Sequence, residues 1–193
     1  MRSSSRKLVT LCLVFSVQGV AAVQAATEPP TSEASTPQRI SVLAGKLSYT
    51  LPQGYVQREL PELDAEARAR GMTGTMYVNA AQKRMVVVTE TPVPEGSIEG
   101  DNDEEFLLGL ANGTISRHES GYKDFRILRD KEVVKKNGLG ILEIDAYGTL
   151  GNDQLLNTTL LAASGTTAAY IHLISPRDTR KTHIALIKAI IGE

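Results

Sequence analysis

Apolar and polar residues alternate in several short segments of the chain, a pattern that predicts strands. From Ile40 to Leu51 the alternation continues around Gly45, and we expect one bent strand there, closed by a proline. Two more strands are expected at 75–78 and 84–91. The second contains consecutive apolar residues, which are typical of a central strand covered on both faces.

Helix-forming composition and helical spacing of apolar residues indicate two helices in the middle of the chain. Residues 61–70 begin with a proline and are rich in Ala, Glu and Arg, which predicts a surface helix. A second helix is expected after a cap at Asp101 or Asn102, with acidic residues in its first turn. Its apolar stripe consists of Phe106, Leu107, Leu110 and Ile115. Gly109 and Gly113 lower helix propensity within it, and we expect them to mark close packing against the sheet.

The rest of the chain has the pattern of a meander followed by a helix. Extended segments are expected near 125–135, 139–150, 153–163 and 167–175. They are separated by Asn137-Gly138, Gly151-Asn152 and Ser164-Gly165, dipeptides that suit tight hairpins. A final helix is expected after a cap at Asp178, with Gly192 at its C-terminal end. The predicted fold is α+β: a mostly antiparallel sheet with a C-terminal four-strand meander, flanked by helices.

Residues 1–25 have the pattern of a secretory signal peptide. Basic residues precede a short apolar run from Leu8 to Val17, and small residues surround an expected cleavage site between Ala25 and Ala26. The run is too short to span a bilayer stably, so no integral membrane span is expected in the mature chain. Residues 26–38 are rich in Pro, Ser and Thr and are expected to form a flexible tether before a single domain at 39–193.

Charge and cysteine content narrow the classes of partner and chemistry. Cleavage would leave 18 basic against 22 acidic residues, a net charge of −4 with neutral histidines, which argues against nucleic acid as a partner. Cys12, the single cysteine, lies inside the expected leader, so the mature chain would have no disulfide. The residue before it is Leu11 rather than the small residue of a lipid-attachment site, so a lipoprotein anchor is not expected.

The three histidines form no metal-binding motif, because no two lie at the spacing of helical ligands. His172 shares a strand face with Tyr170, and we expect it to be a core or rim residue that holds a hydrogen bond. A small-ligand or catalytic pocket near these two residues is the alternative. His183 follows a basic cluster and is expected at a solvated helix end. The cluster, whose alternative role is contact with lipid headgroups, consists of Arg177, Arg180 and Lys181.

Carboxylates and hydroxyls offer only weak catalytic candidates. Glu143 and Asp145 lie two residues apart on one face of an expected strand; paired carboxylates can perform acid–base chemistry, but an outer face in water carries such pairs routinely. Ser164 lies in a hairpin turn and not in a nucleophile elbow. The glycines at 138 and 140 open no helix and so form no phosphate loop. We expect no catalytic residues, no cofactor and no metal.

Two segments carry a resemblance to a known family. The run ISVLAGKLSYTLP at 40–52 resembles the opening strand of the DcrB family of bacterial envelope proteins, in which a similar G-K-L-S-[FY]-x-L-P run follows a leader and a low-complexity tether. The segment from Asn157 to Ser175, with the final helix, resembles the last two strands and terminal helix of that family. The resemblance covers 39–193 and implies a fold shared with PsbP and Mog-type proteins. It departs at Ala25, where the family leader ends in a lipid-anchored cysteine.

The resemblance also implies a location and a function. DcrB proteins are periplasmic, associate with the inner membrane and are connected with phage uptake and envelope maintenance; the resemblance implies no catalytic residues. We therefore expect a non-enzymatic periplasmic binding or scaffold protein, with envelope or inner-membrane proteins as partners and a homodimer as an open alternative. Relatives of similar fold are chaperones for hydrophobic segments of effectors, but these are cytoplasmic, which the leader disfavours. The sequence does not specify the partner, the oligomeric state or the physiological process.

Overall fold

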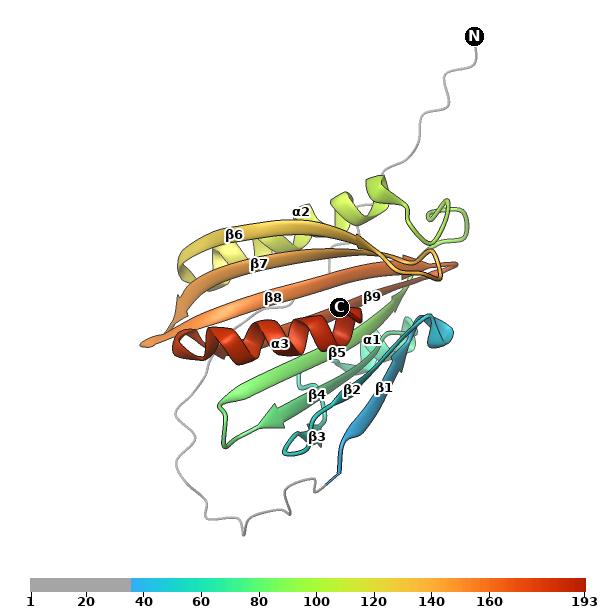
Figure 1. The fold of residues 1–193 in the computed structure, drawn as a ribbon. Helices are drawn as coiled ribbons and strands as arrows, with labels where there is room; N and C mark the ends of the chain where they lie inside the picture. Colours follow the sequence, from blue (N-terminus) through green and yellow to red (C-terminus); the bar gives the residue numbers. More distant parts are fainter. Residues whose placement is uncertain (1–35) are drawn as a thin grey trace.

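A seven-stranded antiparallel sheet with a layer on each face forms the centre of the computed structural model, which describes residues 36–193 (Figure 1). The expected leader, its cleavage site at Ala25 and Ala26, and residues 26–35 of the expected tether lie outside the described residues. In sheet order the strands are β3 (Val56–Arg58), β4 (Thr73–Asn79), β5 (Arg84–Pro92), β9 (Thr167–Pro176), β8 (Asp153–Ser164), β7 (Gly140–Leu150) and β6 (Lys123–Val134). The predicted class, α+β with a mostly antiparallel sheet, is confirmed.

The two halves of the sheet meet where β5 pairs with β9. Strands β6 to β9 pair in chain order, each antiparallel to the next. The last of them, β9, then pairs with β5, so that Val88 lies opposite Ile171. The β6–β7 ladder contains two register shifts, one on each side of Arg126 and Ile127. The centre of the sheet thus depends on pairing between segments that are distant in sequence.

The first predicted strand is in fact a hairpin. β1 (Gln38–Val42) and β2 (Leu47–Leu51) form a separate two-stranded sheet, joined by the short 3-10 helix η1 (Leu43–Gly45). The prediction of one bent strand is wrong because Leu43, Ala44 and Gly45 all have positive φ, at 53°, 51° and 91°, and therefore reverse the chain.

Helix α3 (Arg180–Ile191) lies beside β2 on the same face of the large sheet (Figure 1). Gly192 ends the helix in the left-handed conformation, at φ 80°, as predicted. Asp178 is not its cap, because the 3-10 helix η2 (Arg177–Thr179) precedes it and Thr179 occupies the cap position. With the hairpin and the sheet, this helix encloses the largest apolar core. Its members include Leu47, Leu51, Leu139, Ile141, Leu160, Ile171, Leu173, Ile187 and Ile190.

The opposite face of the sheet is covered by α1 (Ala65–Ala69) and α2 (Glu104–Gly121). Helix α1 is shorter than predicted because Asp64 caps it, with a side chain that accepts a hydrogen bond from the Ala67 amide at 2.7 Å. Helix α2 begins after Asp103, which accepts from the Phe106 amide at 3.0 Å. The predicted cap at Asp101 or Asn102 is wrong; Asp101 instead accepts hydrogen bonds from Lys46 at 2.5 Å and Ser164 at 2.8 Å.

The glycines of α2 face away from the sheet. The buried positions of the helix are Leu107, Ala111 and Thr114, which recur at helical spacing on one side. A Cβ atom at Gly109 or Gly113 would meet nothing within 4 Å. The expectation that these glycines mark close packing is therefore wrong. Within the described residues, no helix is long and apolar enough to cross a membrane.

The layer formed by β1, β2 and α3 is narrower than the sheet beneath it. It covers the central strands and leaves a hollow on each side. One hollow lies between β1 and strands β4 and β5; the other lies between α3 and strands β6 to β8. These two hollows are open to solvent, and the side chains that line them are candidates for binding.

Candidate functional site

A chain of buried hydrogen bonds connects α3 with the sheet. His183 lies in the first turn of α3, and its side chain points down onto β8 and β9 because it belongs to the buried stripe of the helix. Its Nδ1 lies 2.8 Å from Ser175 Oγ, and its Nε2 lies 2.8 Å from Thr158 Oγ1. Thr158 Oγ1 in turn donates to Asp145 Oδ1 at 2.6 Å. The expectation of a solvated His183 is wrong, since the residue is 3% exposed.

The direction of each proton follows from this geometry. Thr158 has one hydroxyl hydrogen, which it donates to the carboxylate of Asp145, so its oxygen accepts from His183 Nε2–H. Burial lowers the pKa of His183 to about 4, so the ring is neutral at pH 7. Its Nδ1 is then an acceptor, which receives the hydrogen of Ser175. Every donor in the chain therefore points toward Asp145.

Asp145 and its neighbour Glu143 share one arginine. Arg129 of β6 donates to Asp145 Oδ2 from Nη2 at 2.8 Å and from Nε at 3.2 Å, and its Nη2 also donates to Glu143 Oε1. The side chain of Glu143 is 1% exposed, whereas that of Arg129 is 50% exposed. Burial, and then the charge of Asp145, raises the pKa of Glu143. The expectation of a water-facing pair is wrong for Glu143, which is buried and hydrogen-bonded to Arg129, whereas the Asp145 side chain keeps 17% exposure.

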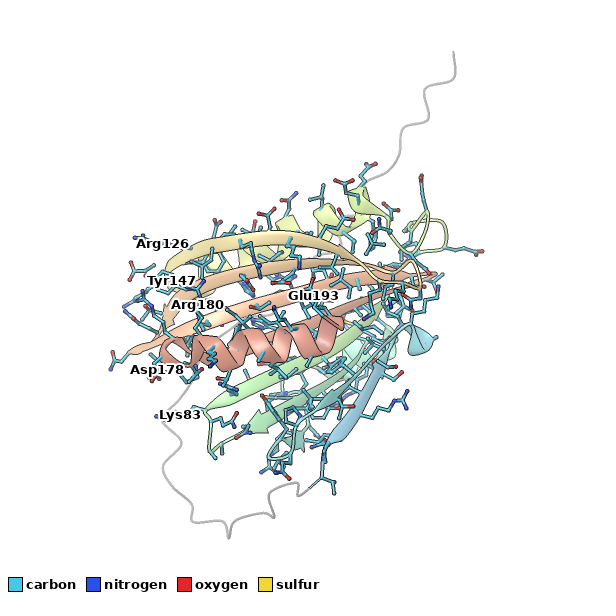
Figure 2. All side chains as sticks on the ribbon, in the orientation of Figure 1. Lys83, Arg126, Tyr147, Asp178, Arg180 and Glu193 are labelled. Atoms are coloured by element: carbon cyan, nitrogen blue, oxygen red, sulfur yellow. The ribbon has the colours of Figure 1, made fainter. Side chains whose placement is uncertain are left out.

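These residues form the floor of a cavity of about 230 Å³ along α3. Arg180 and Glu193, at opposite ends of the helix, both line it (Figure 2). The apolar part of its wall consists of Leu128, Leu156, Ile184, Ile187 and Ile191. Polar groups on the floor and an apolar wall on one side are the usual lining of a small-ligand site.

The same network lacks the geometry of a hydrolase. Ser175 is 1% exposed, and it does not line the cavity along α3. Its hydroxyl hydrogen is already donated to His183, whose other nitrogen is held by Thr158 rather than directly by a carboxylate. A serine nucleophile needs access to substrate and a nearby group of donors for the developing oxyanion. The network therefore fixes α3 on the sheet without presenting a reactive oxygen.

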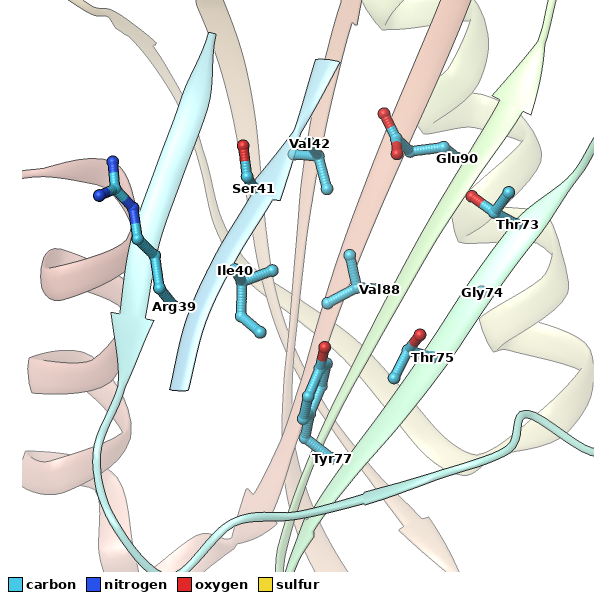
Figure 3. A pocket seen from close by; sticks show the side chains of 10 residues that line it. All are labelled: Arg39, Ile40, Ser41, Val42, Thr73, Gly74, Thr75, Tyr77, Val88 and Glu90. Carbon is cyan, nitrogen blue, oxygen red and sulfur yellow. The ribbon is translucent and has the colours of Figure 1, made fainter. Parts of the chain in front are cut away.

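The second hollow is an open groove of about 320 Å³ beside β1 (Figure 3). Ile40 and Val42 lie on the side of β1 that faces the groove, with Val88 opposite them. Polar lining comes from Arg39, Ser41, Thr73, Thr75 and Glu90, together with the Tyr77 ring. Glu90 accepts a hydrogen bond from the Leu43 amide at 2.7 Å, which ties the hairpin to β5.

Unpaired strand edges flank this groove. β1 pairs with β2 on one side, and on its other side no strand of residues 36–193 pairs with it. β3 pairs with residues 76–78 of β4 and leaves residues 73–75 without a strand partner on that edge. Free backbone amide and carbonyl groups along a strand edge are a template for another extended chain.

The third candidate, His172 with Tyr170, lies under α2. His172 Nε2 shares a hydrogen bond with Asn157 Oδ1, and its ring stacks on that of His118 at a centroid distance of 4.9 Å. Neither described hollow is lined by His172 or Tyr170. Burial, and then the positive charge of Arg117, lowers the pKa of His118 to about 4. The structure thus agrees with a hydrogen-bonded rim histidine, and among residues 36–193 no group of three metal-ligating side chains occurs.

Sequence reasoning paired Glu143 with Asp145 but treated His183 separately and did not connect it with them. Asp145 and Thr158 are opposite each other in the β7–β8 register, and Asn157 is opposite Ile174 in the β8–β9 register. The signal that could have found the network is the row of polar residues at Asn157–Thr159 inside a strand that is otherwise buried. The β1 groove had no such signal, because it depends on how the hairpin lies on the sheet.

Comparison with known proteins gives the fold. No family model matches the sequence, and no curated protein matches it. Among solved structures, cyanobacterial PsbP (CyanoP) from Synechocystis sp. PCC 6803 is similar over 86% of this chain and 95% of that chain, with a TM-score of 0.59 and 10% identity. A protein of unknown function from Pseudomonas aeruginosa is similar over 79% of this chain and 92% of that chain, with a TM-score of 0.43 and 12% identity. The chain has a PsbP-like α+β fold, as its resemblance implied.

Proposed function

We propose that this protein is an exported, non-enzymatic binding protein of the DcrB type, which holds an extended segment of an envelope protein in the β1 groove. The observation that carries the proposal is the pair of unpaired strand edges on the two sides of that groove. The leader pattern of residues 1–25 supports export to the periplasm, and the PsbP-like fold supports the resemblance on which the DcrB assignment rests.

A strand added in the groove could make backbone hydrogen bonds and side-chain contacts, the two kinds of interaction by which sheets bind peptides. Its backbone would hydrogen-bond to the free edge of β1, which gives affinity without dependence on sequence. Its alternate side chains would lie against Ser41, Thr73 and Thr75, which are the accessible part of the lining, and this favours small or polar residues. Arg39 and Glu90 provide one charge of each sign, so the preferred segment would carry complementary charges at its ends.

The absence of catalysis is supported by the state of the buried network. Its serine is inaccessible, and both nitrogens of His183 are held inside the protein. The fold of PsbP-like proteins does not by itself specify an activity. Binding requires only the unpaired strand edges and the side chains that line the groove, whereas hydrolysis would require Ser175 to be accessible to substrate.

Site-specific crosslinking in cells tests the groove. A photo-crosslinking residue is placed in the full chain at Ser41 or Thr75, both of which line the groove. The control position is Glu119, which is exposed on α2 and lies on the opposite face. We expect the same adduct from both groove positions, mapped by mass spectrometry to one extended segment of one envelope protein. Equal adducts from Glu119, or none from the groove, would show that the proposal is wrong.

Export is tested separately. The intact mass and N-terminal sequence of the protein recovered from the periplasmic fraction should correspond to a chain that starts at Ala26. A chain that keeps residues 1–25 and remains in the cytoplasm would exclude the periplasmic role while leaving the groove itself unaffected.

A further inference from the structure

Arg84, the first residue of β5, is a buried cation with no carboxylate paired to it. The residue is 8% exposed, and it shares the face of β5 on which Val86 joins the largest apolar core. None of the ion pairs among residues 36–193 includes it. Its Nη1 donates to Gln82 Oε1 at 3.1 Å and its Nη2 donates to Thr182 Oγ1, and both acceptors are neutral. A buried charge is costly unless an opposite charge pairs with it.

Two hydrogen-bond donors at this place also lack an acceptor. Arg84 Nε and the Tyr55 hydroxyl are both buried, and neither has a hydrogen-bond partner within the part of the chain that the structure describes. The two residues are neighbours, since burial raises the pKa of Tyr55 and the charge of Arg84 opposes that rise. Tyr55 is 1% exposed and keeps its hydroxyl hydrogen. Because buried donors are as a rule hydrogen-bonded, one acceptor shared by these two groups is the simplest way to satisfy both.

The N-terminus of α3 adds positive potential to the same place. Thr182, the acceptor for Arg84 Nη2, lies in the first turn of this twelve-residue helix, which contains no acidic residue. Thr179 occupies the cap position, but its hydroxyl donates to the Pro176 carbonyl at 2.8 Å and does not cap the helix. Asp178, in the preceding η2, is exposed and forms no ion pair with Arg84. Helix N-termini favour anions and disfavour cations, so the buried guanidinium increases the demand for negative charge here.

The tight packing around these donors limits a ligand to a very small ion. Gly54 precedes Tyr55, and a Cβ atom at Gly54 would lie 3.0 Å from Asn79 Nδ2, so this loop packs closely on the end of β4. Neither Arg84 nor Tyr55 lines either of the two hollows described above. A phosphate or an organic acid would need such a hollow. A halide ion is close to a water molecule in size, and a water takes about 30 Å³.

A water molecule could accept from the same two donors, but it would leave the charge of Arg84 unbalanced. We propose that Arg84 and Tyr55, at the N-terminus of α3, bind one small monovalent anion of the halide class, which in solution is chloride. The ion accepts from Arg84 Nε and from the Tyr55 hydroxyl and balances the buried guanidinium. It thereby connects the loop between β2 and β3 with β5 and α3. This site is independent of the segment held in the β1 groove.

Urea unfolding of the full mature protein at constant ionic strength tests the site. Sodium chloride replaces sodium gluconate stepwise, because gluconate is too large to enter. The folded-to-unfolded ratio should rise as 1 + [Cl⁻]/Kd, which is about eleven-fold when chloride is at ten times its Kd. Bromide should act in the same way. An equal unfolding midpoint in chloride and in gluconate would overturn the proposal.

Three variants separate a bound ion from a general effect of salt. Arg84→Met removes the charge and keeps an unbranched side chain, and Tyr55→Phe removes one hydroxyl that has no partner among residues 36–193. Arg84→Met should abolish the difference between chloride and gluconate, and Tyr55→Phe should weaken chloride binding about ten-fold. Tyr49→Phe is the matched control, because it removes another buried hydroxyl whose charged-group neighbour is Tyr77 and not an arginine, and it should keep the full difference.

Bromide also locates the ion directly. Crystals of the protein grown in sodium bromide should show an anomalous peak between Arg84 Nε and the Tyr55 hydroxyl, and this peak should be absent in Tyr55→Phe or much weaker there. Tyr55→Phe decides the question even if Arg84→Met does not fold. A chloride effect that is undiminished in Tyr55→Phe, or bromide peaks confined to the protein surface, would show that no such site exists.

Discussion

At the scale of single residues, burial keeps the histidines neutral, and one of them, His183, connects α3 to the sheet through hydrogen bonds. Thr158 is the middle of the chain from Ser175 to Asp145, since it accepts from His183 and donates to the carboxylate. Its removal leaves the buried His183 Nε2 and the partly buried Asp145 Oδ1 without their hydrogen-bond partner, whereas removal of Ser175 affects His183 Nδ1 alone. An unpaired buried group costs about 1–3 kcal/mol, and more if it is charged.

The first prediction concerns that difference. Thr158→Val, which keeps the shape of the side chain, should lower the free energy of unfolding by about 2–4 kcal/mol, and Ser175→Ala by about 1–2 kcal/mol. Urea unfolding at pH 7 measures both. Equal losses, or a smaller loss for Thr158→Val, would show that Thr158 does not connect His183 with Asp145.

The second prediction concerns pH. Burial lowers the pKa values of His183 and His118 to about 4 and that of His172 to about 3. Between about pH 4 and 6.5 the unfolded chain therefore binds protons that the folded chain does not, and the free energy of unfolding rises with pH by up to about 1.4 kcal/mol per pH unit for each histidine. This stability is complete above about pH 6.5 and is lost as the pH falls toward 4.

The raised pKa of Glu143 acts in the opposite direction, since its contribution falls as the pH rises above the pKa of the unfolded carboxyl. Three histidines outweigh one carboxyl, so we expect a net loss of stability from pH 7 to 4.5, measured by urea unfolding at each pH. His118→Gln removes one titrating group and should make the dependence shallower by about a third. A flat profile would contradict the assigned burial of the histidines.

The residue scale is also where the sequence was least informative. His183 follows three basic residues, and local composition alone indicates a solvated helix end. Its burial depends on which face of α3 meets the sheet, and that is set by Ile187, Ile190 and Ile191 further along the helix. Its partners Thr158 and Ser175 lie on β8 and β9, and only the register of these strands in the sheet brings both within hydrogen-bond distance of His183.

At the scale of elements, α2 contains two interior glycines that lower its stability. Gly109 and Gly113 lie inside the helix with open space where a Cβ would point. Glycine in a helix interior is destabilising by roughly 0.5–1 kcal/mol relative to alanine, because it loses more backbone freedom on folding.

The third prediction follows from these two positions. Gly109→Ala and Gly113→Ala should each raise the free energy of unfolding by about 0.5–1 kcal/mol in chemical denaturation. Gly140→Ala is the matched contrast, because its Cβ would lie 1.8 Å from Asn102 Oδ1 and force a displacement. Destabilisation by Gly109→Ala would show that this face of α2 is covered in solution.

Element positions were more predictable than element ends. Period-two alternation indicated the strands, and helical spacing indicated α2 and α3, because these periods follow from backbone geometry. The caps at Asp103 and Thr179 differ from those predicted, since several polar residues compete at each helix start. Helix α1 was predicted to begin at Pro61, but Asp64 is its cap. The β1–β2 hairpin was missed because its turn uses Leu43 and Ala44 at positive φ, which few non-glycine residues adopt.

At the scale of the whole molecule, the sheet ends at β6, a twelve-residue edge strand with apolar residues exposed. Ile127 and Leu128 are 45% and 50% exposed, so they offer a surface to another sheet edge. Seven of its residues carry charge, and the register shifts around Ile127 make the edge irregular. Charges and bulges on an edge strand prevent it from pairing with other chains.

The fourth prediction tests that protection. Arg126→Val together with Asp130→Val leaves the net charge unchanged and removes two charges from the edge. Sedimentation velocity should then show association that increases with concentration. Glu66→Val together with Arg70→Val removes one charge of each sign from α1 and should not associate. Association of both variants would point to general loss of solubility and not to the edge.

The pairing of β5 with β9 has a consequence for how the chain acquires its structure. Val88 pairs with Ile171, which lies 83 positions later, so the sheet closes only when nearly all of the chain is present. Contacts between distant segments slow folding, and such topologies fold in roughly milliseconds to seconds. A chain that emerges from its N-terminal end would expose the β5 edge throughout the synthesis of β6, β7 and β8. The sheet therefore cannot be completed before β9 (Thr167–Pro176) has been synthesised. A chaperone that covers the β5 edge would act before that point.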